Sequence, residues 1–287
     1  MATMKAIKKR ISSVNSTKKI MKAMNLVATS RLQKAKARLE HIRPLSDSLN
    51  QVMDSIKASM DNDDEIAFCK EREVKSIAYI LFTSDRGLCG SYNANVSKEA
   101  LALIEANGGK PEKLITVGKK GWEYFRRREK NIVSRHPAAS ELAAFSDAEL
   151  LGSQAIRMFL SGEADEVYVV HTHFETILTH VPRVVKLLPF KHESTDDKGG
   201  SSHVMTFDPD PATFMENAIP MYVNLSIFGA MIESAVCEQA SRMTSMDAAT
   251  RNATEIIEDL TLEYNRVRQS KITQELIEIV TGANAVK

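Results

Sequence analysis

The last quarter of the sequence is one long stretch of strong helix formers, and it constrains the fold more than any other feature. Between about Pro211 and Ala283, only Pro220 and Gly229 interrupt it before Gly282. Met, Ala, Leu, Glu, Gln and Arg recur throughout, and these residues lose little freedom in a helix. A continuous helix of this length would extend roughly 100 Å. A compact domain of this size is far shorter, so most of the helix must project.

This projecting helix needs a partner, because long isolated helices of ordinary composition are marginal in water. Alternating steps of three and four residues define a mostly apolar seam along one side of it. The seam passes through Leu225, Phe228, Ile232, Ala235, Gln239, Arg242, Met246, Ala249, Ala253, Ile256, Leu260, Glu263 and Val267. Such a seven-residue repeat is typical of a coiled coil.

The N-terminal region offers the matching helix. From about Ala2 to Lys57 it contains no glycine and one proline, Pro44, where we expect a kink. Its seam follows Ile7, Ile11, Val14, Lys18, Met21, Asn25, Ala28, Leu32, Ala35, Leu39 and Ile42. The polar seam residues Lys18 and Asn25 tend to fix the register at some cost in stability. The two ends of the chain are therefore predicted to form a long antiparallel coiled coil.

Charge is distributed unevenly in a way that supports this pairing. The whole chain has a net charge of +1, but residues 1–43 hold twelve Lys or Arg and one acid. Residues 221–287 carry an excess of three negative charges. This complementarity favours pairing and orientation more than it adds stability. A transit peptide would also be basic and acid-poor, but the heptad pattern here continues unbroken into the following region.

Cysteine usage and hydropathy bear on the cellular setting. The three cysteines, Cys69, Cys89 and Cys237, are far apart and odd in number, which indicates a reduced intracellular compartment. We expect no membrane span, because no apolar run approaches the roughly 20 residues that crossing a bilayer requires.

The middle of the chain alternates strands with helices, which indicates a doubly wound, Rossmann-like α/β domain. Helices are expected at 93–107, 119–128 and 147–160, and strands at 74–82, 113–117, 131–134, 165–174 and 183–190. The last two strands follow each other without a helix, so one of them is expected to be antiparallel at the edge. A polar loop at 192–202 leads back to the long helix. The predicted organisation is a helix at 1–60, an α/β insert at 74–191 and a helix at 209–287.

Three short segments of the middle region invite a ligand-binding interpretation, and each has a plainer one. The segment 118–121 (GKKG) follows a strand and opens a helix, but it lacks the full phosphate-loop glycine pattern, which favours a plain turn. The segment 84–93 lies where a doubly wound sheet binds ligands, yet no nearby His completes a catalytic relay, which favours a structural turn. The acidic segment 61–65 lacks the spacing of a calcium loop, which favours a solvated turn.

One strand carries a spacing that suits a metal site. His171, His173 and Glu175 alternate along it, so their side chains point to one face. The residues by themselves favour a polar strand face without a ligand over this metal site. Two other function classes also remain open from the residues. One is an enzyme that uses the α/β domain with a helical dimerisation stalk. The other is a coiled-coil protein that binds nucleic acid, although no aromatic residue precedes Phe68 to stack bases.

The chain resembles the gamma subunit of the rotary (F-type) ATP synthase over essentially its whole length. Three motifs carry the resemblance, at 18–28 (KKIMKAMNLVA), at 84–90 (SDRGLCG) and at the end of the chain. The last comprises 264–269 (YNRVRQ), 272–276 (ITQEL) and 279–283 (IVTGA). The redox-regulated cysteine insertion of the chloroplast form is absent, and the group of His171, His173 and Glu175 is no part of the family pattern.

The resemblance implies a non-catalytic rotor shaft that couples rotation of the membrane c-ring to ATP synthesis or hydrolysis. Its partners would be three alpha and three beta subunits, the epsilon subunit and the c-ring. No cofactor, metal, nucleic acid or direct bilayer insertion is implied. The implied location is peripheral, on the cytoplasmic face of a bacterial plasma membrane.

The resemblance also implies contact residues. It places Lys22 and Met24 near the lever segment of beta, and Arg268 and Gln269 at a loop of beta that grips the shaft. Further coupling contacts are implied at Arg242, Thr273 and Gln274.

Overall fold

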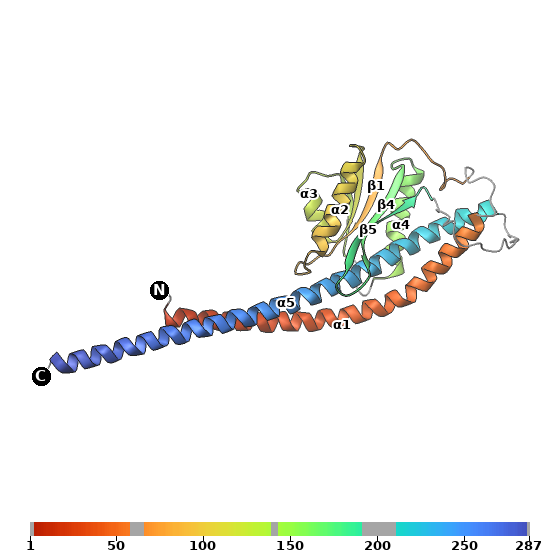
Figure 1. The fold of residues 1–287 in the computed structure, drawn as a ribbon. Helices are drawn as coiled ribbons and strands as arrows, with labels where there is room; N and C mark the ends of the chain where they lie inside the picture. Colours follow the sequence, from red (N-terminus) through yellow and green to blue (C-terminus); the bar gives the residue numbers. More distant parts are fainter. Residues whose placement is uncertain (1–2, 58–65, 139–142, 191–210, 286–287) are drawn as a thin grey trace. The chain divides into compact units, whose positions relative to one another are not determined.

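The computed structural model describes residues 3–57, 66–138, 143–190 and 211–285. Two long helices are its largest elements (Figure 1), α1 (Met4–Lys57) and α5 (Pro211–Ala285). Both ends of the chain are therefore helical, as predicted, and each helix continues through its internal proline, Pro44 or Pro220. The acidic segment 61–65 and the polar loop expected at 192–202 lie outside the described residues.

The chain divides into two compact units whose boundaries fall inside both long helices. One unit combines Met1–Ala28 with Arg242–Lys287, and the other is Thr29–Ser241. Helical hydrogen bonding continues across both boundaries. The inner parts of α1 and α5 thus belong to the same compact unit as the α/β elements.

In the first unit, the N-terminal part of α1 follows the predicted seam. Ile7 and Ala28 are buried, and the seam positions between them are partly buried. The seam residue Asn25 donates a hydrogen bond from Nδ2 to the carbonyl oxygen of Met243 at 2.9 Å. A polar group at such a position accepts only some alignments of the two helices, so it fixes their register.

The seam of α5 departs from the prediction at two positions in this unit. Met246, Ala253 and Leu260 are buried as expected. Ile256, however, is 43% exposed and Glu263 is also exposed, while their neighbours Ile257 and Tyr264 are partly buried. Steps of three and four residues therefore alternate in the opposite order between Ala253 and Val267. The prediction was wrong about Ile256 and Glu263, because either order keeps a seven-residue repeat.

The second unit is built on a five-stranded sheet with the strand order β3-β2-β1-β4-β5. The first four strands in this order are parallel, and β5 pairs antiparallel with β4 at the edge, as expected. The strands are β1 (Ile77–Phe82), β2 (Glu112–Val117), β3 (Ile132–His136), β4 (Glu166–Phe174) and β5 (His180–Leu188). Every residue of β1 is buried, as expected for the central strand of a sheet covered on both faces.

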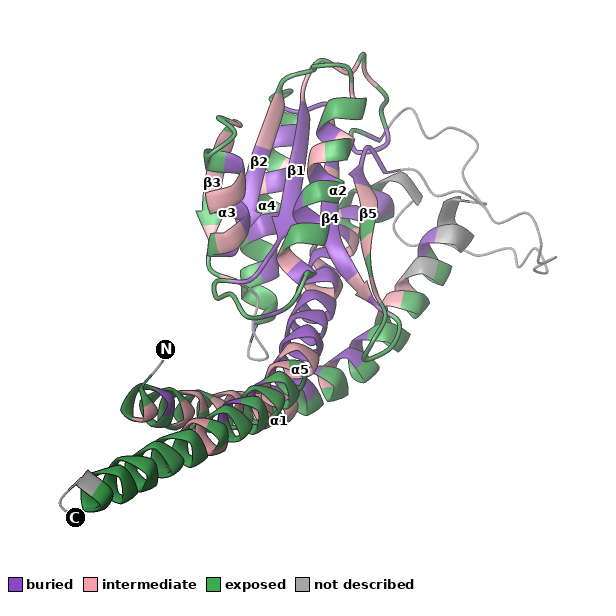
Figure 2. Ribbon diagram, turned by 60° about the vertical axis from the view of Figure 1, so that its left-hand side comes forward, coloured by how far each residue is buried: buried purple, intermediate pink, exposed green. Residues whose placement is uncertain are grey.

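Helices cover both faces of this sheet, which confirms the doubly wound α/β prediction. Figure 2 shows α2 (Tyr92–Ala106) and α3 (Lys119–Arg126) on one side and α4 (Phe145–Leu160) on the other. On the first side, Val96, Ala100 and Ile104 of α2 join one apolar cluster with Tyr79 and Leu81 of β1. On the other side, α4 packs closely against the part of α5 that belongs to this unit.

That part of α5 is buried all round rather than along one seam. Every residue from Ala230 to Ser241 is buried, which is visible as a purple stretch in Figure 2. Contrary to expectation, α5 also contains an 18-residue window with a mean hydropathy of 1.3, long and apolar enough by composition to cross a membrane. Because 56% of that window is buried inside the protein, the window fits a core helix.

Candidate functional site

The turn at 118–121 has no room for a phosphate, because the protein's own groups already occupy it. The amide of Lys119 donates to Oδ1 of Asp85 at 2.8 Å, and the amide of Gly121 donates to Oγ1 of Thr83 at 2.9 Å. Gly118 packs so closely that a Cβ there would lie 2.2 Å from the carbonyl oxygen of Thr83. The amides that a phosphate loop would offer are thus engaged internally, which supports the plain-turn interpretation.

The turn at 84–93 is likewise held by its own hydrogen bonds. Ser84 Oγ donates to the carbonyl oxygen of Arg86 at 2.7 Å, and Asn93 Nδ2 donates to Ser84 Oγ at 2.7 Å. Cys89 is 2% exposed, and its carbonyl oxygen accepts a bond of 2.6 Å from Ser241 Oγ of α5. The serine and cysteine are therefore tied into the structure rather than presented to a substrate, which supports a structural turn that anchors α5.

The C-terminal end of α5 presents a different kind of surface. Every residue from Arg268 to Asn284 is exposed, and this end of the helix is green throughout in Figure 2. Its exposed apolar side chains are Ile272, Leu276, Ile277, Ile279 and Val280, between 47% and 67% exposed. Lys271 and Glu275 form an ion pair of 3.6 Å across one turn. A contiguous apolar surface of this kind marks a site of protein interaction.

The residues implied as coupling contacts lie in the first unit. Four of them are exposed on neighbouring turns of the α5 end: Arg268, Gln269, Thr273 and Gln274. Their polar groups bond locally, because Thr273 Oγ1 donates to the Gln269 carbonyl oxygen at 2.9 Å and Gln274 Nε2 donates to Glu278 Oε1 at 3.0 Å.

The other three implied contacts differ in exposure. On α1, Lys22 is exposed and Met24 is partly buried. Arg242 of α5 is only 8% exposed, so other parts of this chain cover it. Six of the seven implied contacts therefore have surface to offer a partner, and Arg242 does not.

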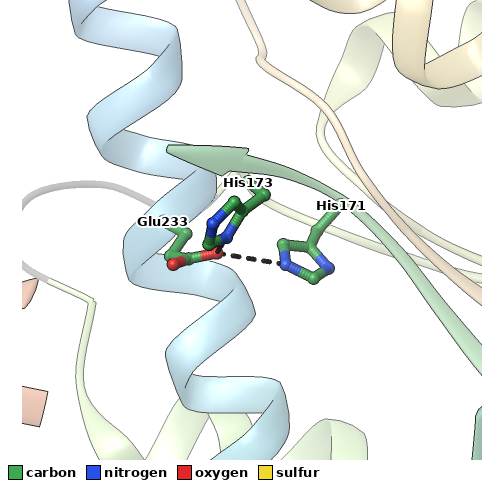
Figure 3. A group of neighbouring side chains, drawn as sticks. All are labelled: His171, His173 and Glu233. Atoms are coloured by element: carbon green, nitrogen blue, oxygen red, sulfur yellow. Dashed lines mark hydrogen bonds and ion pairs between the residues drawn. The ribbon is translucent and has the colours of Figure 1, made fainter. Parts of the chain in front are cut away.

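The histidine pair of β4 is confirmed as a cluster, but its acidic member is not Glu175. Glu175 follows the end of β4 and is exposed. The carboxylate beside the histidines belongs to Glu233 of α5 (Figure 3), whose Oε2 lies 3.2 Å from His171 Nε2 and 3.0 Å from His173 Nδ1. Burial raises the pKa of Glu233, but hydrogen bonds from His171 and His173 more than offset it and leave the pKa lowered.

Comparison with known proteins identifies the family to which this chain belongs. A family model described as ATP synthase matches residues 3–286. The ATP synthase gamma chain of Alkaliphilus metalliredigens is 40% identical over 292 residues, which cover 99% of each chain. That of Chlorobaculum tepidum is 38% identical over the full length of both chains. This chain belongs to the ATP synthase gamma chain family.

Chains in solved structures of mitochondrial ATP synthases show the same fold. A chain of the Euglena gracilis mitochondrial ATP synthase matches with a TM-score of 0.69 and 14% identity, over 99% of this chain and 94% of that one. A chain from the central stalk and c-ring structure of the Tetrahymena thermophila enzyme matches with a TM-score of 0.60 and 23% identity. This second match covers 80% of this chain and 99% of that one.

Membership of the gamma chain family confirms the function that the resemblance implied. The gamma chain is the central rotor shaft of a membrane-associated ATP synthase, and it couples rotation to the synthesis or hydrolysis of ATP. It is a non-catalytic subunit, since catalysis belongs to the alpha and beta subunits. The turns at 84–93 and 118–121 are held by internal hydrogen bonds, and the end of α5 from Arg268 to Asn284 is exposed. Both observations agree with a subunit that acts by contacting other proteins.

Proposed function

We propose that this gamma chain turns inside a ring of three alpha and three beta subunits and stands, with epsilon, on the c-ring. The proposed location is the cytoplasmic face of a bacterial plasma membrane. The single observation that carries this proposal is the end of α5, where Arg268 to Asn284 are exposed and present five apolar side chains between Ile272 and Val280. Such a surface suits an apolar sleeve formed by surrounding subunits.

The shaft acts on catalytic sites by being asymmetric. A binding partner shifts a conformational equilibrium only through its different affinity for the two states. Moving a site from 1:99 to 99:1 takes about 5.5 kcal/mol of such difference. Arg268 and Gln269 lie one turn before Ile272 on the same side of α5, so this side carries a polar patch followed by apolar side chains. The opposite face, with Lys271, Gln274 and Glu278, is mainly polar. As the shaft turns, each of three equivalent sites meets these faces in succession.

Pairing with α1 gives the shaft its stiffness. Two packed helices resist twisting better than one, and the hydrogen bond from Asn25 to Met243 opposes sliding of one helix along the other. Lys22 and Met24, on the same stretch of α1, would then be held at a constant position around the shaft. We propose them as contacts to the lever segment of beta.

The test is a double substitution at the proposed contact with the beta loop, Arg268→Ala with Gln269→Ala, in the reconstituted complex. Both side chains are exposed, so the isolated chain should keep its helical content and melting temperature. Loss of 1–2 kcal/mol of differential contact should lower proton-driven ATP synthesis roughly fivefold or more. The matched control is Arg251→Ala with Asn252→Ala, an exposed pair of the same chemistry 17 residues earlier on the same helix. Normal ATP synthesis by the Arg268→Ala, Gln269→Ala variant, or an equal loss in the control, would refute the proposed contact with beta.

A further inference from the structure

The cluster at the junction of β4 and α5 has the donor set and the spacing of a metal site. His171 Nε2, His173 Nδ1 and a carboxylate oxygen of Glu233 all lie within 4.8 Å of one another (Figure 3). Both imidazoles approach the same oxygen, Oε2, at 3.2 and 3.0 Å. Ligands about 2.0–2.1 Å from a tetrahedral Zn²⁺ lie about 3.3 Å from each other, close to these two separations. We propose that His171, His173 and Glu233 bind a divalent transition-metal ion, with Zn²⁺ fitting best.

The chemistry of the donors selects the class of ion. Two imidazole nitrogens and one carboxylate oxygen suit zinc and its neighbours in the first transition row. Calcium and magnesium require sets of oxygen ligands, which this cluster does not offer. Three protein ligands leave a fourth tetrahedral position for water.

The surroundings leave space for that fourth ligand. A groove of about 870 Å³ is lined by all three proposed ligands and by Arg43 of α1. His173 is more accessible than His171, with side-chain exposures of 29% and 7%, so an ion would enter past His173. The site is thus reachable from the groove although two of its ligands are well shielded.

Arg43 lies against the site without occupying the shared oxygen. Its Nη2 is 3.3 Å from Glu233 Oε1 and 2.9 Å from the carbonyl oxygen of Phe174. The guanidinium therefore orients the carboxylate and leaves Oε2 facing the imidazoles. Its positive charge also repels a cation, which sets the affinity below that of a site with an unopposed carboxylate.

Two further observations in the cluster bear on the ion. His171 Nδ1 is buried and has no hydrogen-bond partner among the described residues, so within the protein this ring is bonded only through Nε2, to Glu233. Cys237 lies nearby on α5, but its thiol donates to the carbonyl oxygen of Thr172 at 3.4 Å. Burial raises the pKa of that thiol.

A bound ion would fasten α5 to β4 within the second unit. The two histidines belong to β4 and the glutamate belongs to the fully buried stretch of α5. An ion that binds only the folded chain stabilises it. At 100 times its dissociation constant, Zn²⁺ should raise the melting temperature by roughly 5 °C or more.

The experiment uses the untagged full-length chain after treatment with a chelator, with Zn²⁺ and Co²⁺ as probes. We expect one ion per chain by calorimetry and a Co²⁺ absorption spectrum of tetrahedral type without thiolate bands. His173→Gln removes the most accessible ligand and should weaken binding by at least about tenfold. Glu175→Gln is the matched control, because it changes an exposed carboxylate two residues along the same segment. It should leave affinity unchanged.

A second measurement on the unaltered chain guards against a variant that fails to fold. With labelled histidine, Zn²⁺ should shift the imidazole NMR signals of His171 and His173 and leave the other five histidines in place. Three results would overturn the proposal. They are the absence of saturable binding, binding that Glu175→Gln abolishes, and Zn²⁺ shifts confined to other histidines.

Discussion

Replacing Leu260 with alanine measures how much the buried seam between the paired helices contributes to stability. Leu260 is 6% exposed, whereas Leu262, two positions further on, is 70% exposed. Leu260→Ala removes an almost completely buried side chain, which costs about 2–4 kcal/mol. Leu262→Ala makes the same chemical change on the outside, so it should cost less than about 0.7 kcal/mol. Ile256→Ala, at 43% exposure, should fall between them, near 1 kcal/mol.

Hydrogen exchange read by mass spectrometry suits this comparison, because it reports the local stability of α5 without unfolding the whole chain. A loss of about 2 kcal/mol should accelerate exchange roughly 30-fold in the peptides around Leu260. The two outer substitutions should accelerate it only a few-fold. If Ile256→Ala has the largest effect, the seam runs as the sequence first indicated and the observed register is wrong. Equal effects of Leu260→Ala and Leu262→Ala would mean that this stretch has no seam.

Two further predictions concern the α/β unit. Gly118→Ala should lower the free energy of unfolding by about 3 kcal/mol or more in urea denaturation, because Gly118 has a φ of +99° and its Cβ would strike the Thr83 carbonyl. Gly109→Ala, at a φ of +75° with nothing within 4 Å, should cost only about 1–2 kcal/mol, and equal losses would contradict the contact. Burial lowers the pKa of His180 from 6.5, so the unfolded chain binds that proton more readily and native stability should fall as the pH drops below 6.5. His180→Gln should flatten the melting temperature across that range, and an unchanged slope would contradict the prediction.

Periodicity in the sequence was enough to locate both long helices and the whole seam of α1. It failed at one point of α5, where Ile256 and Ile257 are equally apolar and either can continue the repeat. The choice becomes clear one repeat later, at residues 263 and 264, because the aromatic Tyr264 suits a buried seam better than the charged Glu263. At this point of α5, the charge of Glu263 beside the aromatic Tyr264 indicates that the order of the steps should be reversed.

The buried stretch of α5 could not be predicted in the same way. Glu233 and Glu238 lie within it, and their charges indicate exposed positions. In the fold, Glu233 is held by His171 and His173, which lie some 60 residues earlier in the chain. A partner so distant in sequence is visible only once the strand and the helix are packed together.

The candidate sites show the same limit. Alternation along a strand correctly placed His171 and His173 on one face, because that relation is local. It chose Glu175 as the third member, since Glu233 has no local relation to the pair. The coupling residues of the shaft have no signal of their own in periodicity. Arg268 and Gln269 lie on an exposed helix end, and their importance depends on a partner that the single chain does not contain.

Both long helices pass from one compact unit to the other without a break, at residues 28–29 in α1 and 241–242 in α5. No loop lies at either crossing to act as a swivel. Load applied at one end must therefore be taken up by elastic deformation of helical hydrogen bonds spread over many turns. We expect a transmission of this kind to store strain as a torsion spring does.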